Sequence, residues 1–202
     1  MQKLSNQNYI QQISIDCVIF GYHQQQLKVL VPKLDFTGDF YALPSGFVGQ
    51  NEDIDTAAKR ILEERTGLKN VYLEQFKVFG KSARKSANFL DKLIELNPEK
   101  LTQKSQNEGD YDWFTKRFIS VGYYALVDIN CVIPKISSLD SSINWINIYG
   151  LPNLIMDHNL IVEKAVEELR NDLDVKLNVF HLMPENFTMK DLQEVYETIF
   201  RH

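Results

Sequence analysis

The segment from residue 46 to residue 68, GFVGQNEDIDTAAKRILEERTGL, constrains the fold of this chain more than any other stretch. Residues 52 to 64 place apolar side chains at the spacing of one helical face, and Gly67 follows where helices commonly end. The apolar positions are Ile54, Ala57, Ala58, Ile61 and Leu62. Glu52 and Arg60 are expected to form an ion pair that holds the preceding loop against the helix. The segment therefore predicts a loop, a helix from Glu52 to Glu64 and a glycine that ends it.

This segment resembles the signature of the Nudix superfamily, G-x5-E-x7-R-E-U-x-E-E-x-G-U, in which U is a bulky aliphatic residue. The residues in register with that pattern are Gly46, Glu52, Arg60, Leu62, Glu64, Gly67 and Leu68. Two positions depart from it, because Ile61 and Arg65 stand where the pattern has glutamate. The resemblance implies an α/β (α+β) domain in which a mixed β-sheet is sandwiched between helices. It assigns structural roles to Gly46, Glu52, Arg60 and Gly67.

The two departures change the charge on one face of the predicted helix. Residues 61, 64 and 65 share that face because they are three and four positions apart. In active Nudix enzymes, three carboxylates on such a face hold a divalent metal against a pyrophosphate. Here Glu64 and Arg65 carry opposite charges, and Mg²⁺ needs closely spaced anionic oxygens. The sequence therefore predicts no metal site, no required cofactor and no catalytic residue, and Arg65 becomes a candidate phosphate contact. Alternatively, Ile61 simply extends the apolar stripe of the helix.

The composition is that of an ordinary globular protein of one domain with a small appendage. The chain has 202 residues, of which 44% are hydrophobic and 24% charged. It contains no apolar run long enough for a membrane span, and its polar start lacks a hydrophobic signal core, so we expect a cytoplasmic protein without a membrane partner. Cys17 and Cys131 lie in apolar runs and are expected to be reduced core residues.

The order of the remaining elements fits a mixed α/β domain. Five runs are rich in strand-forming residues: 13 to 20, 27 to 31, 71 to 79, 118 to 127 and 145 to 149. Residues 157 to 170 have helical periodicity. Between residues 81 and 113 lies a polar insertion with a short helix expected from Ala87 to Leu96. This insertion is interpreted as a mobile surface loop, or alternatively as a lid over a ligand pocket.

The C-terminal part carries a second resemblance. Trp145 and the pairs Leu151–Pro152, Asp157–His158 and Leu169–Arg170 resemble an arrangement that, in one branch of the superfamily, closes the Nudix domain and leads into a winged helix-turn-helix. The spacing after Trp145 differs by one residue from that of the branch. The sequence thus predicts a Nudix-like effector-binding domain over residues 1–172 and the beginning of a winged helix-turn-helix over residues 173–202.

A final helix is expected after Thr188, which is a plausible N-cap with Asp191 at the capping-box position. Its predicted buried stripe consists of Met189, Leu192, Val195, Tyr196, Ile199 and Phe200. The alternative is an amphipathic helix that simply packs on the main domain, because periodicity alone does not separate the two.

Together these regions resemble the Nudix-related transcription regulators of the NrtR type, whose Nudix-like domain binds ADP-ribose or a sugar and whose dimer holds DNA. The implied partners are such a small effector, a second copy of the chain, and DNA. Residues 152 to 202 contain ten acidic and five basic residues, and no basic recognition helix or wing occurs before His202. We therefore expect DNA binding only through a part beyond these residues, which alone should bind DNA poorly.

Three functions remain open from the sequence. The first is an effector-sensing domain with Lys33, Arg65 and Arg84 as ligand contacts, each of which is alternatively an ordinary surface cation. The second is an active Nudix hydrolase that cleaves a nucleoside diphosphate linked to another moiety. In that case Glu64 and Glu63 would be catalytic, and Glu64, Asp110 and Asp112 would hold Mg²⁺. The third is a binding module without a DNA partner.

Overall fold

The computed structural model describes residues 7–82, 84, 87–99, 113 and 115–200. In chain order the elements are β1 (Tyr9–His23), β2 (Gln26–Leu34), β3 (Ser45–Gly49), α1 (Ile54–Thr66), β4 (Tyr72–Phe79), α2 (Ala87–Leu96), β5 (Ile119–Val127), β6 (Asp140–Asn147), the 3-10 turn η1 (Ile148–Gly150), α5 (His158–Val175), the 3-10 helix η2 (Leu177–Leu182) and α6 (Met189–Phe200).

The strands of the described part form one mixed sheet in the order β4-β5-β1-β2-β6, with β3 also paired to β1. β1 and β5 are parallel, whereas the other pairs are antiparallel. The predicted mixed sheet is therefore confirmed. The predicted strand at residues 145 to 149 is only partly right, because β6 begins at Asp140 and gives way to η1 at Ile148. Strand β3, which includes Gly46 of the signature segment, was not predicted.

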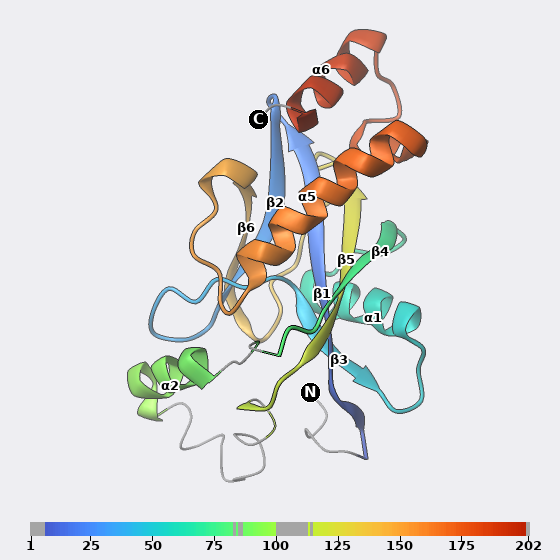
Figure 1. The fold of residues 1–202 in the computed structure, drawn as a ribbon. Coiled ribbons are helices and arrows are strands. Elements are labelled where there is room, and N and C mark those ends of the chain that lie inside the picture. Colours follow the sequence, from blue (N-terminus) through green and yellow to red (C-terminus); the bar gives the residue numbers. More distant parts are fainter. Residues whose placement is uncertain (1–6, 83, 85–86, 100–112, 114, 201–202) are drawn as a thin grey trace.

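Helices cover both faces of the sheet, as Figure 1 shows with α5 on one face and α1 on the other. Successive strand residues point to opposite faces, so β1 sends Val18 and Phe20 towards α5 and Cys17 and Ile19 towards α1. The α5 side is filled from the helix by Ile161, Val162, Ala165, Val166, Leu169 and Leu173. The expected sandwich of a sheet between helices is confirmed.

Helix α1 is the predicted signature helix, shifted along the chain. It begins at Ile54 because Asp53 is the N-cap, whose side chain accepts the Thr56 N–H at 2.7 Å. Glu52 therefore lies in the loop and not in the helix. The helix ends at Thr66, and Gly67 follows with φ 71°, the left-handed conformation that favours glycine. The stripe from Ala57 to Leu62 is buried as predicted, although Ile54 at its start is exposed.

Part of the insertion packs on the domain. Helix α2 has the predicted bounds, and its Leu90 and Leu93 are buried. The ring of Phe89 meets Phe40 edge to face, and the Asn97 amide exchanges hydrogen bonds with the backbone of Thr37. Phe89 and Asn97 therefore connect α2 to the loop that precedes β3. A mobile loop or a lid over residues 81 to 113 as a whole stays a prediction. Asp110 and Asp112 lie outside the described residues.

The C-terminal elements pack against α5. Arg170 Nε donates to the Ile199 carbonyl at 2.7 Å, and the Tyr196 hydroxyl donates to the Leu173 carbonyl at 3.2 Å. The predicted capping box is confirmed, since the backbone N–H of Thr188 reaches Asp191 at 2.7 Å. The predicted boundary between residues 172 and 173 falls inside α5. No described helix has the length and apolar character that a bilayer crossing requires.

Three predictions of burial are wrong. Cys131 is exposed, because β5 ends at Val127 and the chain enters a turn before the cysteine. Met189 is 77% exposed and Phe200 37% exposed, because only the side of α6 that carries Val195 and Ile199 faces the core. The burial of Cys17 is confirmed.

Candidate functional site

A cleft of about 680 Å³ opens beside the signature helix, and its volume is in the range of about 300–1,000 Å³ that small-molecule sites occupy. Its walls are β3, one face of α1, the start of β1 and the loop after β5. The lining residues are Gln7, Asn8, Tyr9, Ser45, Gly46, Phe47, Gly49, Gln50, Asn51, Glu52, Arg60, Ile61, Glu64, Arg65, Ser137, Ser138 and Leu139. The signature segment thus supplies most of one wall.

Glu52 and Arg60 hold the loop and the helix together, as the sequence predicted. Arg60 donates to both carboxylate oxygens of Glu52, from Nε at 2.9 Å and from NH2 at 2.6 Å. Glu52 also accepts the Gly49 N–H at 2.6 Å, and Arg60 donates to the Phe47 carbonyl. The hydrogen bonds from Arg60, and to a lesser degree that from Gly49, hold the pKa of Glu52 below its ordinary value. This pair fixes the wall of the cleft.

Ile61 is part of the core and not of the polar wall. It is 1% exposed and packs beneath β3, where a Cβ on Gly46 would lie 2.8 Å from Ile61 Cγ1. Ile61 therefore continues the apolar stripe of the helix. It also makes the first of the three signature carboxylate positions apolar, so both interpretations of this residue agree with the structure. The small residue at position 46 lets the strand approach the helix this closely.

Gly46→Ala should lower the free energy of unfolding by about 1–3 kcal/mol, because the new methyl group meets the buried branch of Ile61. Urea denaturation followed by circular dichroism would measure it. The matched control is Gly150→Ala, since a Cβ at Gly150 meets no atom of the described structure within 4 Å and should change stability by less than about 0.5 kcal/mol. Equal stability of the two variants would contradict the close packing.

Arg65 is held by a carboxylate that sequence reasoning missed. Its NH2 donates to both oxygens of Asp140 at 2.7 and 3.0 Å, and its NH1 donates to the Ser45 carbonyl at 3.1 Å. Arg65 is 8% exposed, so the alternative of an ordinary surface cation is wrong. Its Nε is buried without a hydrogen-bond partner in the described structure, which costs about 1–3 kcal/mol. The Nε–H of the guanidinium is therefore left to satisfy.

The remaining carboxylates of the signature helix are also engaged. Glu64 lines the cleft and accepts from Arg60 at 3.0 Å, whereas Glu63 pairs with Lys69 at 2.6 Å and does not line the cleft. Within the described ranges, histidine, cysteine and carboxylate side chains form no group of three or more that could hold a metal ion. The three former ligand positions thus carry a buried isoleucine and two residues in opposite-charge pairs.

The other two proposed ligand contacts lie elsewhere. Lys33 is in β2 and pairs with Asp39 at 2.8 Å, and neither residue lines the cleft. Arg84 is 8% exposed and does not line the cleft either, so it is not the surface cation that the sequence allowed as an alternative. Arg84 is buried and bonded to several partners. Its location in a polar insertion of the sequence did not indicate this.

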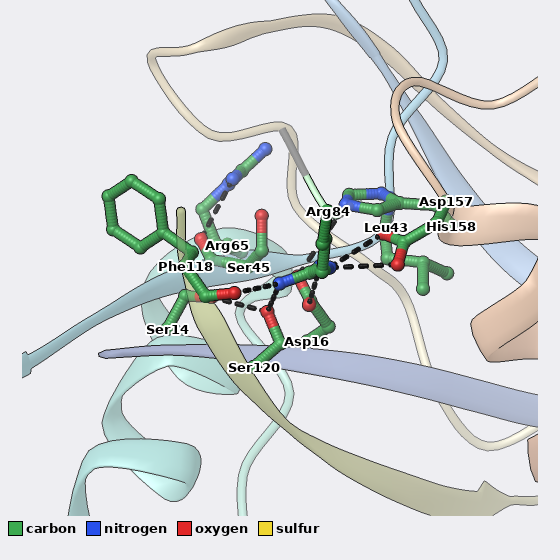
Figure 2. Close-up of polar contacts among 10 residues, drawn as sticks. All are labelled: Ser14, Asp16, Leu43, Ser45, Arg65, Arg84, Phe118, Ser120, Asp157 and His158. Carbon is green, nitrogen blue, oxygen red and sulfur yellow. Dashed lines mark hydrogen bonds and ion pairs between the residues drawn. The ribbon is translucent and has the colours of Figure 1, made fainter. Parts of the chain in front are cut away.

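Arg84 lies at the centre of a polar group that we call the Arg84 cluster, which is buried except for the partly exposed Asp157. The cluster, shown in Figure 2, is made up of Ser14, Asp16, Arg84, Ser120, Asp157 and His158. Arg84 Nε donates to both oxygens of Asp157 at 3.0 and 2.8 Å. Its NH1 donates to Ser120 Oγ at 2.7 Å, and its NH2 lies 3.5 Å from Asp16 Oδ2. The cluster ties β1, β5 and the start of α5 to the segment before α2.

His158 occupies the first turn of α5 with a defined tautomer. Its Nδ1 accepts the Leu43 N–H at 2.9 Å, so the ring proton is on Nε2, which lies 3.6 Å from Asp16 Oδ1. Burial lowers the pKa of this imidazole, and the nearby Asp16 opposes that shift only in part. The Asp157–His158 pair of the sequence was recognised, but its partners Asp16 and Leu43 were not.

The pKa of His158 is lower in the folded chain than in the unfolded chain. As the pH falls below 6.5, His158 is therefore protonated in the unfolded chain while it stays neutral in the folded chain. The contribution of neutral His158 to the free energy of unfolding is therefore complete above pH 6.5. It decreases as the pH falls towards the pKa of the folded state, by at most about 1.4 kcal/mol per pH unit. Urea midpoints between about pH 7.5 and 5.5 should fall less steeply in His158→Gln than in wild type. Parallel slopes would contradict this assignment.

Comparison with known proteins identifies the family. Residues 179–202 match the NrtR DNA-binding winged helix domain. The ADPR responsive transcriptional repressor NtrR of Acinetobacter baylyi is 26% identical over 94% of this chain and 67% of its own length. The crystal structure of Shewanella oneidensis NrtR superposes with a TM-score of 0.70 at 26% identity, over 94% of this chain and 78% of that one. The RNA pyrophosphohydrolase of Pelagibacter ubique is 31% identical over 70% of this chain and 81% of its own.

The chain belongs to the Nudix-related transcription regulators of the Nudix superfamily. Helix α6 and the part of η2 from residue 179 onwards fall within the matched winged-helix segment. The family, the signature helix and the Glu52–Arg60 pair of this Nudix-related regulator were thus predictable from its sequence. Asp140 and Asp16 were missed, because no local pattern marks a carboxylate whose partner is far along the chain.

Proposed function

We propose that this Nudix-related regulator binds an ADP-ribose-like effector in the cleft beside α1 without hydrolysing it, and needs no metal cofactor to do so. The observation that carries the proposal is the state of the three former ligand positions: Ile61 is buried, Glu64 is bonded to Arg60, and Arg65 is bonded to Asp140. A cluster of anionic oxygens for Mg²⁺ would need these positions to be free and acidic. The sequence similarity to an ADPR responsive repressor supports the choice of effector.

The chemistry of the cleft suits a nucleoside diphosphate. Arg60 and Arg65 line the cleft with guanidinium groups, whose planar donors match phosphate oxygens, although Nε of Arg65 is itself buried. Tyr9 and Phe47 add aromatic surface to the same wall, with ring centroids 5.9 Å apart. Aromatic surface of this kind can stack on a base. The positive charge of these two guanidinium groups favours a phosphate-bearing effector over a neutral sugar.

The output of the regulator follows from its family. We propose that it acts in the cytoplasm as a homodimer and holds DNA through the winged-helix domain, of which residues 179–202 are part. The effector then acts by binding one arrangement of the protein more tightly than another, which shifts the population between them. Residues 152 to 202, with twice as many acidic as basic residues, are not expected to bind DNA by themselves.

Titration calorimetry with ADP-ribose, in the presence and absence of Mg²⁺, tests the binding and its metal dependence. We expect equal affinity in both conditions and turnover slower than about 0.1 s⁻¹, below the usual range of about 1–10³ s⁻¹. Faster turnover that is lost in Glu64→Gln would instead establish the hydrolase. Binding of a pentose but not of ADP-ribose would replace the effector and leave the sensor function in place.

A further inference from the structure

We infer that Arg84 is a positioning residue through which an effector in the cleft shifts α5, and with it α6. The inference rests on the proposed function, because it concerns the regulation of that same cleft. Arg84 does not line the cleft and is 8% exposed, so it acts through its neighbours and not by touching the effector. Contacts of the described residues connect the cleft wall to α5 by two routes.

The first route runs along the backbone before β3. Arg65 lines the cleft and donates to the Ser45 carbonyl at 3.1 Å, so a shift of the guanidinium moves the end of this segment. Two residues earlier, the Leu43 N–H donates to His158 Nδ1 at 2.9 Å. His158 is the first residue of α5. The cleft wall and the helix are therefore joined through the backbone of Leu43, Pro44 and Ser45.

The second route is the Arg84 cluster, which decides how far α5 can follow that movement. Ser45 pairs with Asp16 across β3 and β1, and Asp16 faces both the Arg84 guanidinium and His158. Arg84 in turn grips Asp157, which immediately precedes α5, through two hydrogen bonds. Asp157 makes no side-chain cap hydrogen bond, so this carboxylate attaches the helix to the cluster and does not cap it.

Two unsatisfied groups lie at the ends of this path. Within the described structure, neither Nε of Arg65 nor Oδ2 of Asp16 has a hydrogen-bond partner, although both atoms are buried. Asp16 Oδ2 lies 3.5 Å from Arg84 NH2, an ion-pair distance that a small movement would turn into a hydrogen bond. A phosphate at Arg65 would compete with Asp140 for the guanidinium and release the Ser45 contact. In the second arrangement that we infer, a shift of Arg84 towards Asp16 would give Oδ2 of Asp16 a hydrogen-bond partner.

The far end of α5 passes the movement to the C-terminal elements. Arg170 donates to the Ile199 carbonyl, and Leu173 accepts from the Tyr196 hydroxyl, so α6 is hydrogen-bonded to the same helix. Figure 1 shows α5 crossing the sheet and α6 beside its C-terminal half. A rotation or slide of α5 therefore reaches α6 through direct contacts, as a chain of hydrogen bonds and packed elements can transmit.

Hydrogen–deuterium exchange of the whole chain, with and without saturating ADP-ribose, tests the inference. In wild type we expect the amides of α6 to change their exchange rates by at least about threefold on binding. Asp157→Ala removes the carboxylate that Arg84 grips, and we expect it to bind ADP-ribose in calorimetry while the change in α6 disappears. Glu167→Ala on the same helix is the matched control, because Glu167 pairs with surface Lys164 and should leave the change intact.

Arg84→Lys provides a second variant that keeps the charge but not the paired hydrogen bonds, and it should also lose the change in α6. If wild type binds ADP-ribose without any change in α6, or if Asp157→Ala shows the full change, the coupling is overturned and the proposed function stands. If wild type does not bind ADP-ribose, the proposed function falls and this inference falls with it.

Discussion

Replacing Arg84 with methionine will lower the free energy of unfolding by about 3–5 kcal/mol, the usual cost of leaving a buried charge without its partner. Methionine fills a similar volume but removes the donors that reach Asp157, Ser120 and the Phe118 carbonyl. Asp16, which is 2% exposed, would lose the guanidinium at 3.5 Å and keep the contact with His158. The effect is large because Arg84, Asp16 and Ser120 are buried.

Urea denaturation at neutral pH measures this change, and the removal of an exposed ion pair is the control. Lys33→Met breaks the pair with Asp39, in which the aspartate side chain is 81% exposed, and should leave the midpoint almost unchanged. A double variant, Asp16→Asn with Arg84→Met, should recover part of the loss because the stranded carboxylate becomes neutral. Arg84→Met with wild-type stability would show that the cluster does not hold α5.

Removing the guanidinium of Arg65 should weaken binding of a phosphate-bearing effector at least about tenfold, or about 1.4 kcal/mol. Arg65→Ala alone would strand Asp140, whose side chain is fully buried, and would confuse lost affinity with lost stability. The variant to measure is therefore Arg65→Ala combined with Asp140→Asn, titrated with ADP-ribose in a calorimeter. Its loss of affinity then reports the missing donors and not an unpaired carboxylate.

Asp140→Asn by itself is the matched comparison for Arg65. It removes the anion that occupies NH2 of Arg65, so the guanidinium becomes freer to meet a phosphate and affinity should stay equal or rise. An unchanged dissociation constant in the double variant would rule Arg65 out as an effector contact. It would leave Arg60, which keeps Glu52 in place, as the other guanidinium of the cleft.

The accuracy of the sequence predictions followed the distance between interacting residues. Three local features were all predicted: the Glu52–Arg60 pair, the helix end at Gly67 and the Thr188–Asp191 capping box. Each of them joins residues that are at most eight positions apart in the sequence. Strand β3 was missed because it is only five residues long and lies next to a loop. Such a short segment shows no clear alternation of apolar and polar residues. Cys131 was placed in the core because the apolar run around it does not show where β5 ends.

The sequence by itself determined the family, the mixed sheet between helices and the loss of acidic residues from the signature helix, because these depend on residue type and local spacing. Only the tertiary structure decided what the buried arginines do. Arg65 meets Asp140 across 75 positions, and Arg84 meets Asp157 across 73. Such pairs depend on strand register and on where α5 begins against the sheet, which periodicity does not encode. The same long-range packing buries Arg65 and Arg84, which the sequence allowed as surface cations. It also connects the cleft wall to α5.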